Sequence, residues 1–219
     1  MARLDLLGRL PRTRRNIAAR ATAKSPELVA RAMQFGFDYF DGSRDYGYGG
    51  YRYDGRWVPV AQDIVAHYGL RAGQRVLDVG CAKGFLVKDL MAACPGLDAL
   101  GLDISHYALT HAEPEVRGRL VQGSCDLLPF ADGSFDLVIG LDVIHNLDRG
   151  GVVRSLKEFE RVGRGRSYIR VDSYHTPEQR AAFVDWVLTA RFHDYPEIWE
   201  ALFAEAGFRG DWTWTVIAA

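Results

Sequence analysis

The chain has 219 residues, 48% of them hydrophobic and 25% charged, and its formal net charge is −1 at pH 7. This composition is typical of one substantial globular domain with an appendage, and the near-neutral charge disfavours nucleic acid as a partner. The three cysteines, Cys81, Cys94 and Cys125, are too widely spaced for a disulfide framework or a zinc site, so we expect no metal. No apolar run approaches the roughly 18 residues of a membrane helix. We expect a cytoplasmic monomer or homodimer with no membrane partner.

Residues 1–24 form a basic arm with seven Lys or Arg residues and a single acid, Asp5. Three interpretations stay open: a solvated or loosely docked arm, a cleaved organellar transit peptide, or an arm that steers an anionic substrate or contacts nucleic acid. A helix is predicted next, because Ser25 is a good N-cap and Pro26 suits the first helical position.

Residues 37–57 are crowded with tyrosine and glycine. Tyrosine supplies rigid contact area and glycine lets the backbone wrap closely. We therefore predict either a lid over a substrate, or an aromatic loop that packs across the helices. The lid hypothesis makes Tyr46, Tyr48, Tyr51 and Trp57 candidate substrate-binding residues.

The stretch 75–84, RVLDVGCAKG, is the strongest local signal. Residues 76–79 form a short β-branched and apolar run typical of a buried parallel strand. A glycine-punctuated turn then leads into a helix at 85–93, and such a turn lets a ligand approach bare backbone N–H groups. The dinucleotide spacing G-x-G-x-x-G is absent, which argues against a pyrophosphate cradle.

Strands and helices alternate along the rest of the chain. A helix is expected at residues 58–68, before the first strand. Further strands are expected at 99–104, 120–123, 135–141, 168–171 and 212–217, and further helices at 107–112, 151–161, 177–189 and 196–206. This order predicts an α/β fold with a doubly wound, mostly parallel sheet and an N-terminal extension of helix and aromatic loop.

The glycine loop resembles motif I of the class I S-adenosylmethionine (SAM)-dependent methyltransferases, and the order of elements resembles their Rossmann-like fold. The resemblance implies a SAM-binding domain at residues 58–219, preceded by the arm, helix and lid at residues 1–57. It implies that SAM contacts Asp78, Gly80, Cys81, Ala82 and Gly84. Ala82 stands where the family commonly has glycine. The family usually ends in a two-strand hairpin, and here the second strand is either absent or lies near residues 188–193.

Asp103 ends the second predicted strand, where a carboxylate can accept both ribose hydroxyls of a bound nucleoside. By resemblance it is the ribose-binding acid, and Ile104 stacks on adenine. The alternative is that Asp103 caps the following helix. The segment 123–136 resembles the family's third motif and adds Ser124, Cys125 and Asp126, although Ser124 replaces a common Asp.

The loop GLDVIHNL at residues 140–147 is expected under the sulfonium of SAM, with Leu141 beside the cofactor. Asp142 and His145 are the candidate catalytic residues, because an unperturbed histidine side chain has a pKa of about 6.5, which suits a general base. The alternative is a histidine that only packs on the sheet. Asn146 is a candidate for binding the acceptor.

Four polar residues, 172–175, follow the fifth predicted strand at the same end of the sheet. From this group we take Tyr174 and His175 as substrate-binding candidates.

We therefore interpret the chain as a SAM-dependent methyltransferase that acts on an oxygen or nitrogen of a small-molecule acceptor, with S-adenosylhomocysteine (SAH) as product. Two alternatives remain. One is a SAM-binding protein that does not methylate, and the other is an RNA or protein methyltransferase that uses the basic arm.

Overall fold

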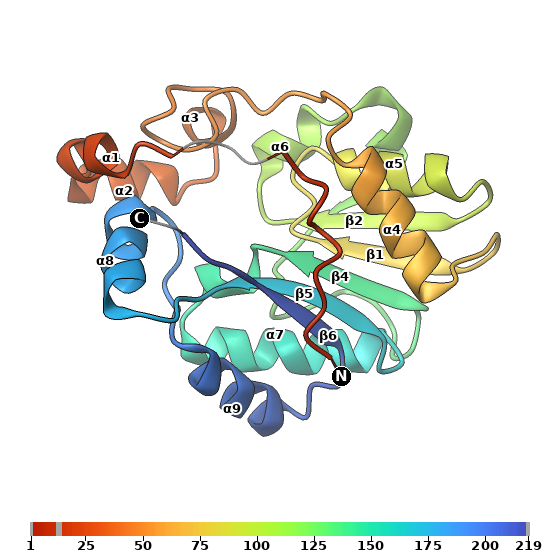
Figure 1. Cartoon of the computed structure of the whole chain (residues 1–219). Helices are drawn as coiled ribbons and strands as arrows, with labels where there is room; N and C mark the ends of the chain where they lie inside the picture. The colour runs from red at the N-terminus through yellow and green to blue at the C-terminus, as the bar shows by residue number, and fades with distance from the viewer. Residues whose placement is uncertain (1, 12–14, 218–219) are drawn as a thin grey trace.

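The computed structural model describes residues 2–11 and 15–217. Its centre is a six-stranded sheet in the order β3-β2-β1-β4-β5-β6, in which every neighbouring pair is parallel (Figure 1). The strands are β1 (Arg75–Val79), β2 (Asp98–Asp103), β3 (Leu120–Gln122), β4 (Leu137–Leu141), β5 (Ser167–Asp172) and β6 (Asp211–Thr215). The predicted doubly wound α/β fold is confirmed, since the sheet is parallel and helical elements connect its successive strands except β3 and β4.

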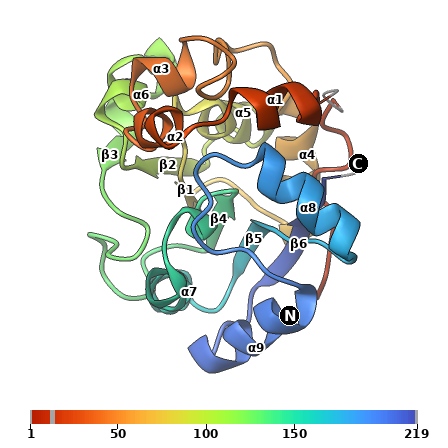
Figure 2. The same cartoon turned by 90° about the vertical axis from the view of Figure 1, so that its left-hand side faces the viewer.

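Helices cover both faces of this sheet. On one face lie α4 (Val58–Tyr68) and α5 (Phe85–Ala93), and on the other α7 (Arg149–Val162) and α9 (Pro196–Ala206) (Figure 1). The remaining helices, α1 (Ile17–Ala23), α2 (Pro26–Ala32), α3 (Phe37–Phe40), α6 (His106–Thr110) and α8 (Pro177–Trp186), gather towards one end of the sheet (Figures 1 and 2). The 3-10 turns η1 (Pro114–Arg119) and η2 (Ile144–Asn146) complete the described elements.

Alternation along the strands divides the core in two. Val76 of β1 packs with α4 and α5, whereas Leu77 and Val79 pack with α7 and α9. Successive side chains of a strand point to opposite faces, so a strand covered on both sides is apolar at almost every position. This is why residues 76–79 lack the polar alternation of a half-exposed strand.

Several predicted boundaries were wrong by a few residues. The fourth strand begins at Leu137 rather than at residue 135, because Phe135 N–H donates to the Val162 carbonyl and the Asp136 carboxylate accepts from Arg75 N–H. Helix α8 ends at Trp186, short of residue 189. Residues 188–193 form no strand, so that possibility for the missing hairpin strand is excluded.

The N-terminus takes a place at the open edge of the sheet. Arg3 forms a parallel bridge with Trp212 of β6, where Leu4 N–H donates to the Trp212 carbonyl and Trp212 N–H donates to the Ala2 carbonyl. An edge strand leaves a row of backbone groups unpaired, and covering them removes a route to aggregation. The first residues therefore protect the open edge of the sheet at β6.

The described residues of the basic arm dock on the rest of the molecule. Leu6 and Leu7 are buried in the cluster that contains α4, and Arg9 pairs with Asp63 of that helix at 2.8 Å. Arg20 in α1 is buried and donates to the carbonyls of residues 44 and 45. At least two of the basic side chains thus make internal contacts.

Within the part of the chain that the structure describes, no helix combines the length and the apolar character needed to cross a membrane.

A buried hydroxyl fastens the N-terminal segment to β5. Tyr168 OH lies 3.1 Å from both the Leu6 N–H, which donates to it, and the Leu4 carbonyl, which accepts from it. Tyr168→Phe should lower the free energy of unfolding by about 1–3 kcal/mol, because it leaves two backbone groups without a partner. Urea unfolding measures this. Tyr195→Phe is the matched control, since that hydroxyl bonds to no described residue, and equal losses in both variants would contradict the prediction.

Candidate functional site

The turn after β1 depends on backbone conformations that exclude most side chains. Gly80 has φ +79° and Gly84 has φ +77°. A Cβ at Gly80 would lie 2.7 Å from the Cβ of Val143, which follows β4. Ala82 also has a positive φ, +50°, a region that favours glycine. The family's usual glycine and this alanine therefore serve the same left-handed turn, with a steric cost for the alanine.

Asp103 joins the turn after β1 to the turn after β2. Its Oδ2 accepts from Ala82 N–H at 2.8 Å, and its Oδ1 accepts from Ser105 N–H at 2.8 Å. Burial raises the pKa of Asp103, and the hydrogen bonds from Ser105 and Ala82 oppose that rise. Ser105, not Asp103, caps α6, because its hydroxyl accepts from Ala108 N–H.

Asp78 lies beside this bridge at the end of β1 and is only 4% exposed. Burial, followed by the charge of Asp103, raises its pKa to about 7. A buried carboxylate with no described hydrogen-bond donor destabilises its own charged form. The charge of Asp78 is therefore offset by no described donor, and a cationic group bound beside it would stabilise its charged form.

The third predicted motif has its side chains engaged with α7. The Asp126 carboxylate accepts from the Ser124 hydroxyl and from Arg154 at 2.8 Å. Burial would raise the pKa of Asp126, but these two partners hold it below its usual value. Cys125 is buried in the core against Ser155. Ile104 differs, because 55% of its surface is exposed beside Asp103.

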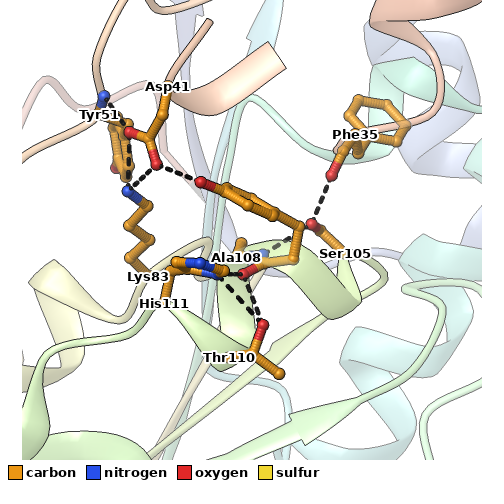
Figure 3. A network of polar contacts seen from close by, with 9 residues as sticks. Phe35, Asp41, Tyr51, Lys83, Ser105, Ala108, Thr110 and His111 are labelled. Atoms are coloured by element: carbon orange, nitrogen blue, oxygen red, sulfur yellow. Dashed lines mark hydrogen bonds and ion pairs between the residues drawn. The ribbon is translucent and has the colours of Figure 1, made fainter. Parts of the chain in front are cut away.

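Segment 37–57, which we call the lid segment, is fastened to both turns. Lys83, in the turn after β1, is 7% exposed and places its Nζ 2.6 Å and 2.9 Å from the two oxygens of Asp41 (Figure 3). The same carboxylate accepts from Tyr107 OH in α6 and from Tyr51 N–H. Phe40 packs on Ala82 and Ala108. The lid segment thus lies directly on the loops that carry Asp103.

Three lid tyrosines face acids at the ends of several strands. Burial raises the pKa of Tyr39 to about 12, and the charges of Asp142 and Asp103 add to the rise. Burial also raises the pKa of Tyr48 and of Tyr51. Tyr48 is nevertheless 42% exposed, so part of its side chain stays accessible.

Asp142 follows β4 and is held in place by two other strands. Arg170 of β5 binds both of its oxygens, and the Thr215 hydroxyl of β6 donates to Oδ1 at 2.8 Å. Burial would raise the pKa of Asp142, but the charges of Arg170 and His145 keep it below its ordinary value. A carboxylate so paired is a poor proton acceptor. The geometry therefore favours an orienting role for Asp142 over that of a base.

His145 in η2 contacts Asp172 at the end of β5. Its Nδ1 lies 3.2 Å from the Asp172 N–H, which donates to it, and 3.3 Å from the Asp172 Oδ2. Burial raises the pKa of Asp172 to about 6, against the opposing charge of His145. His145 is only 4% exposed, so its side chain is buried.

Atoms of Asp142, His145 and Asp172 lie within 4.8 Å of one another, a spacing that a metal ion could bridge. Arg170 already supplies the positive charge beside Asp142, however, and a cation would have to displace its guanidinium. The arrangement is thus complete as an ion-pair network among the described residues.

The remaining binding candidates from the sequence have different surroundings. Tyr51 stacks on Phe85 of α5, whereas Tyr46 lies under the guanidinium of Arg31. Trp57 and Leu141 pack in the α4 and α5 core. Tyr174 is 2% exposed and packs against Phe183 of α8, and His175 lines a separate cavity of about 330 Å³ with Arg3 and Trp214. The Asn146 Oδ1 is buried and accepts no hydrogen bond from any described residue.

Sequence reasoning missed four residues of this network, Asp41, Lys83, Tyr107 and Arg170, whereas it placed Asp172 in the polar group that could line the acceptor site or cap the helix at residue 177. Asp172 carried a usable signal, because it stands at the carboxyl end of a predicted strand. Lys83 could have been singled out as a charged residue in an otherwise small and apolar turn. Asp41 and Tyr107 had no local signal, since their role depends on contacts across the fold.

Comparison with known families and proteins places this site in a wider group. A family model described as a methyltransferase domain matches residues 77–171. A malonyl-[acyl-carrier protein] O-methyltransferase of Legionella pneumophila is 37% identical over 95 residues, which are 42% of this chain and 33% of that protein. A ubiquinone/menaquinone biosynthesis C-methyltransferase of Syntrophotalea carbinolica is 33% identical over 114 residues, 50% of this chain and 46% of that protein. The chain spans less than half the length of these curated relatives.

Solved structures share the fold. A chain of the Haloferax volcanii complex that contains the Trm112 methyltransferase activator superposes with a TM-score of 0.55 at 22% identity, covering 67% of this chain and 66% of that one. The YcgJ protein of Bacillus subtilis gives a TM-score of 0.52 at 20% identity, covering 67% and 66% of the two chains.

The matched region contains β1, β2 and β4, and so the turn after β1, Asp103 and the loop with Asp142 and His145. The fold, the order of the site loops and the matched relatives agree. Residues 77–171 therefore match a methyltransferase domain, and the chain has the fold of the class I SAM-dependent methyltransferases.

Proposed function

We propose that this chain transfers the methyl group of SAM to an oxygen or nitrogen atom of a small-molecule acceptor. The observation that supports it best is the carboxylate of Asp103, which couples the two turns at the carboxyl ends of β1 and β2. In open α/β sheets, ligands bind outside these strand ends at the point where the strand order reverses. Here the order reverses at β1, between β2 and β4.

The residues present fit SAM. Gly80 keeps the positive φ of the turn after β1, and the Asp103 Oδ2, which accepts from Ala82 N–H, retains a lone pair for a ribose hydroxyl. The raised pKa of Asp78 means that a cationic ligand would stabilise its charged form. When bound, SAM supplies a positively charged sulfonium whose methyl group is the electrophile.

The protein's part in such a transfer is alignment and proton management. Methyl transfer is an in-line displacement, so positioning of donor and acceptor supplies much of the rate enhancement. Asp142 is fixed by Arg170 and Thr215 and suits orientation of a polar acceptor. His145 suits the removal of an acceptor proton. The relatives include named O-methyltransferases and C-methyltransferases, and the presence of a candidate base favours an acceptor that carries an acidic proton.

The lid segment is proposed to enclose the reacting groups. It contacts the turn after β1 through Lys83 and α6 through Tyr107, and the carbonyl of Phe35, just before the segment, accepts from the Ser105 hydroxyl. Excluding water strengthens the electrostatic interactions inside a site. The division into a lid-bearing segment 1–57 and a SAM-binding domain 58–219 follows from this proposal.

Asp103→Ala should weaken SAM binding by about 1.5–3 kcal/mol, through the loss of charge-assisted hydrogen bonds, a change of about 10- to 100-fold in Kd. Calorimetric titration with SAM and SAH measures this, with NAD as the control ligand. Asp98→Ala, at the other end of the same strand, should bind like the wild type. Binding of NAD in place of SAM would overturn the proposed cofactor.

His145→Ala should lower kcat by about 10²–10⁴-fold, the usual contribution of a general base, while the Kd for SAM stays within about twofold, a change too small to reflect a lost contact. Initial rates of SAH formation with a screened acceptor give both values. An unchanged rate and pH profile would make His145 a purely structural residue.

Asp41→Asn should loosen the lid segment, because it removes the charge that Lys83 and Tyr107 share. Backbone amides of residues 46–51 should exchange with solvent at least about tenfold faster, equal to about 1.4 kcal/mol of local stability. Hydrogen exchange with and without SAM measures this. Asp63→Asn is the control, because Asp63 lies on α4 outside the lid segment and pairs with the exposed Arg9, and equal exchange in the two variants would refute the lid contact.

A further inference from the structure

The candidate base His145 has a partner that the proposed chemistry does not yet use. The carboxyl end of β5 places both the main chain and the side chain of Asp172 against one ring atom, Nδ1 of His145. No described residue donates to or accepts from Nε2. Nε2 is therefore left without a described partner, and the state of Nδ1 decides whether Nε2 has a free lone pair.

The two contacts at Nδ1 exclude each other. A bare Nδ1 accepts from the Asp172 N–H at 3.2 Å, and the neutral ring then carries its proton on Nε2. A protonated Nδ1 would instead donate to the Asp172 carboxylate, whose Oδ2 lies 3.3 Å away, and the neutral ring would then have a free lone pair on Nε2. Only the second tautomer can act as a base through Nε2.

An ionised Asp172 favours the second tautomer, because a hydrogen bond to a carboxylate is about twice as strong as one between neutral groups. With its pKa raised to about 6, Asp172 is largely ionised above that pH. The charged groups that act on it, besides His145, are Asp142, Arg170 and Arg15.

The surroundings hold both partners still. The indole N–H of Trp199, a residue with no exposed surface, donates to the Asp172 carbonyl at 2.9 Å. The His145 carbonyl accepts from the N–H groups of Arg191 and Phe192 at 2.9 and 3.0 Å. The main chains of Asp172 and His145 are thus held by α9 and by the loop before it.

We propose that Asp172 is a positioning residue that holds His145 in the tautomer with its proton on Nδ1, so that Nε2 can take the proton of the methyl acceptor. This inference rests on the proposed function for its catalytic meaning. The proton leaves the acceptor's oxygen or nitrogen, bonds to Nε2 and gives an imidazolium whose Nδ1–H stays paired with Asp172. The arrangement follows the logic of an aspartate that orients a catalytic histidine without taking its proton.

The variant to test is Asp172→Asn. An Asn amide at this place can donate to Nδ1, which would force the ring proton onto Nε2. Long-range proton–nitrogen NMR of histidine-labelled protein reports the tautomer directly, and the His145 signals are assigned by their loss in His145→Ala. The expected result is a proton on Nδ1 in the wild type near pH 7.5 and on Nε2 in Asp172→Asn. The same tautomer in both proteins would overturn the proposal.

The kinetic prediction uses the same variant. Asp172→Asn should lower kcat at least about 10-fold, as expected for a base held in the wrong tautomer, while KM for the acceptor and the Kd for SAM stay within about twofold, within the range of minor perturbation. Asp185→Asn, an exposed acid on α8, is the matched control and should retain full activity. An Asp172→Asn enzyme with wild-type kcat would also overturn the proposal.

Different results would refute the proposed function and the His145–Asp172 pairing. Absence of SAM binding in the wild type would refute the proposed function and leave the NMR result to decide the His145–Asp172 pairing. Normal SAM binding and turnover with an unchanged tautomer in Asp172→Asn would refute the pairing alone. Should Asp172→Asn unfold, the wild-type tautomer still decides, because a proton on Nε2 contradicts the proposal without any variant.

Discussion

The Asp103 carboxylate is the interaction on which this end of the molecule depends. It spans from β2 to the turn after β1 through two backbone hydrogen bonds, to Ala82 and Ser105, and it stays buried while doing so. Burial raises the free energy of its charged form, and the N–H donors offset part of that cost. Because Ser105 begins α6 and Ala82 precedes α5, the same carboxylate aligns both helices with the sheet.

Four carboxylates meet at the carboxyl ends of the strands, and each is balanced in a different way. Asp78 is buried and has no described hydrogen-bond donor, and Asp103 accepts from backbone N–H groups. Asp142 pairs with an arginine, and Asp172 lies beside a histidine. Their pKa values are accordingly pushed apart, which is how one fold assigns separate roles to chemically identical groups. In the proposed reaction Asp142 orients the acceptor and Asp172 positions His145, and Asp78 is the acid best placed to gain from a bound cation.

The N-terminal residues act at two distant places. Residues 2–4 pair with β6 at the open edge of the sheet, and residues 37–51 cover the turns after β1 and β2. Between them, α1 packs against α8. Arg20 of α1 donates to the carbonyls of residues 44 and 45, and its guanidinium lies over the indole of Trp186. Edge protection, the docked arm and the lid segment are therefore parts of one continuous path over the sheet.

The sequence alone determined the layered architecture, because apolar runs, glycine turns and helix caps act over a few residues, as at 75–84 and at Ser25. The same local patterns pointed to Asp103 and to the His145 loop, since strand ends in a parallel sheet share one edge. Only the tertiary structure decided the partners. Lys83 meets Asp41 across 42 positions, His145 meets Asp172 across 27, and Arg3 meets Trp212 across the whole chain. Such pairs are selected by burial and charge after the chain has folded, and no local preference encodes them.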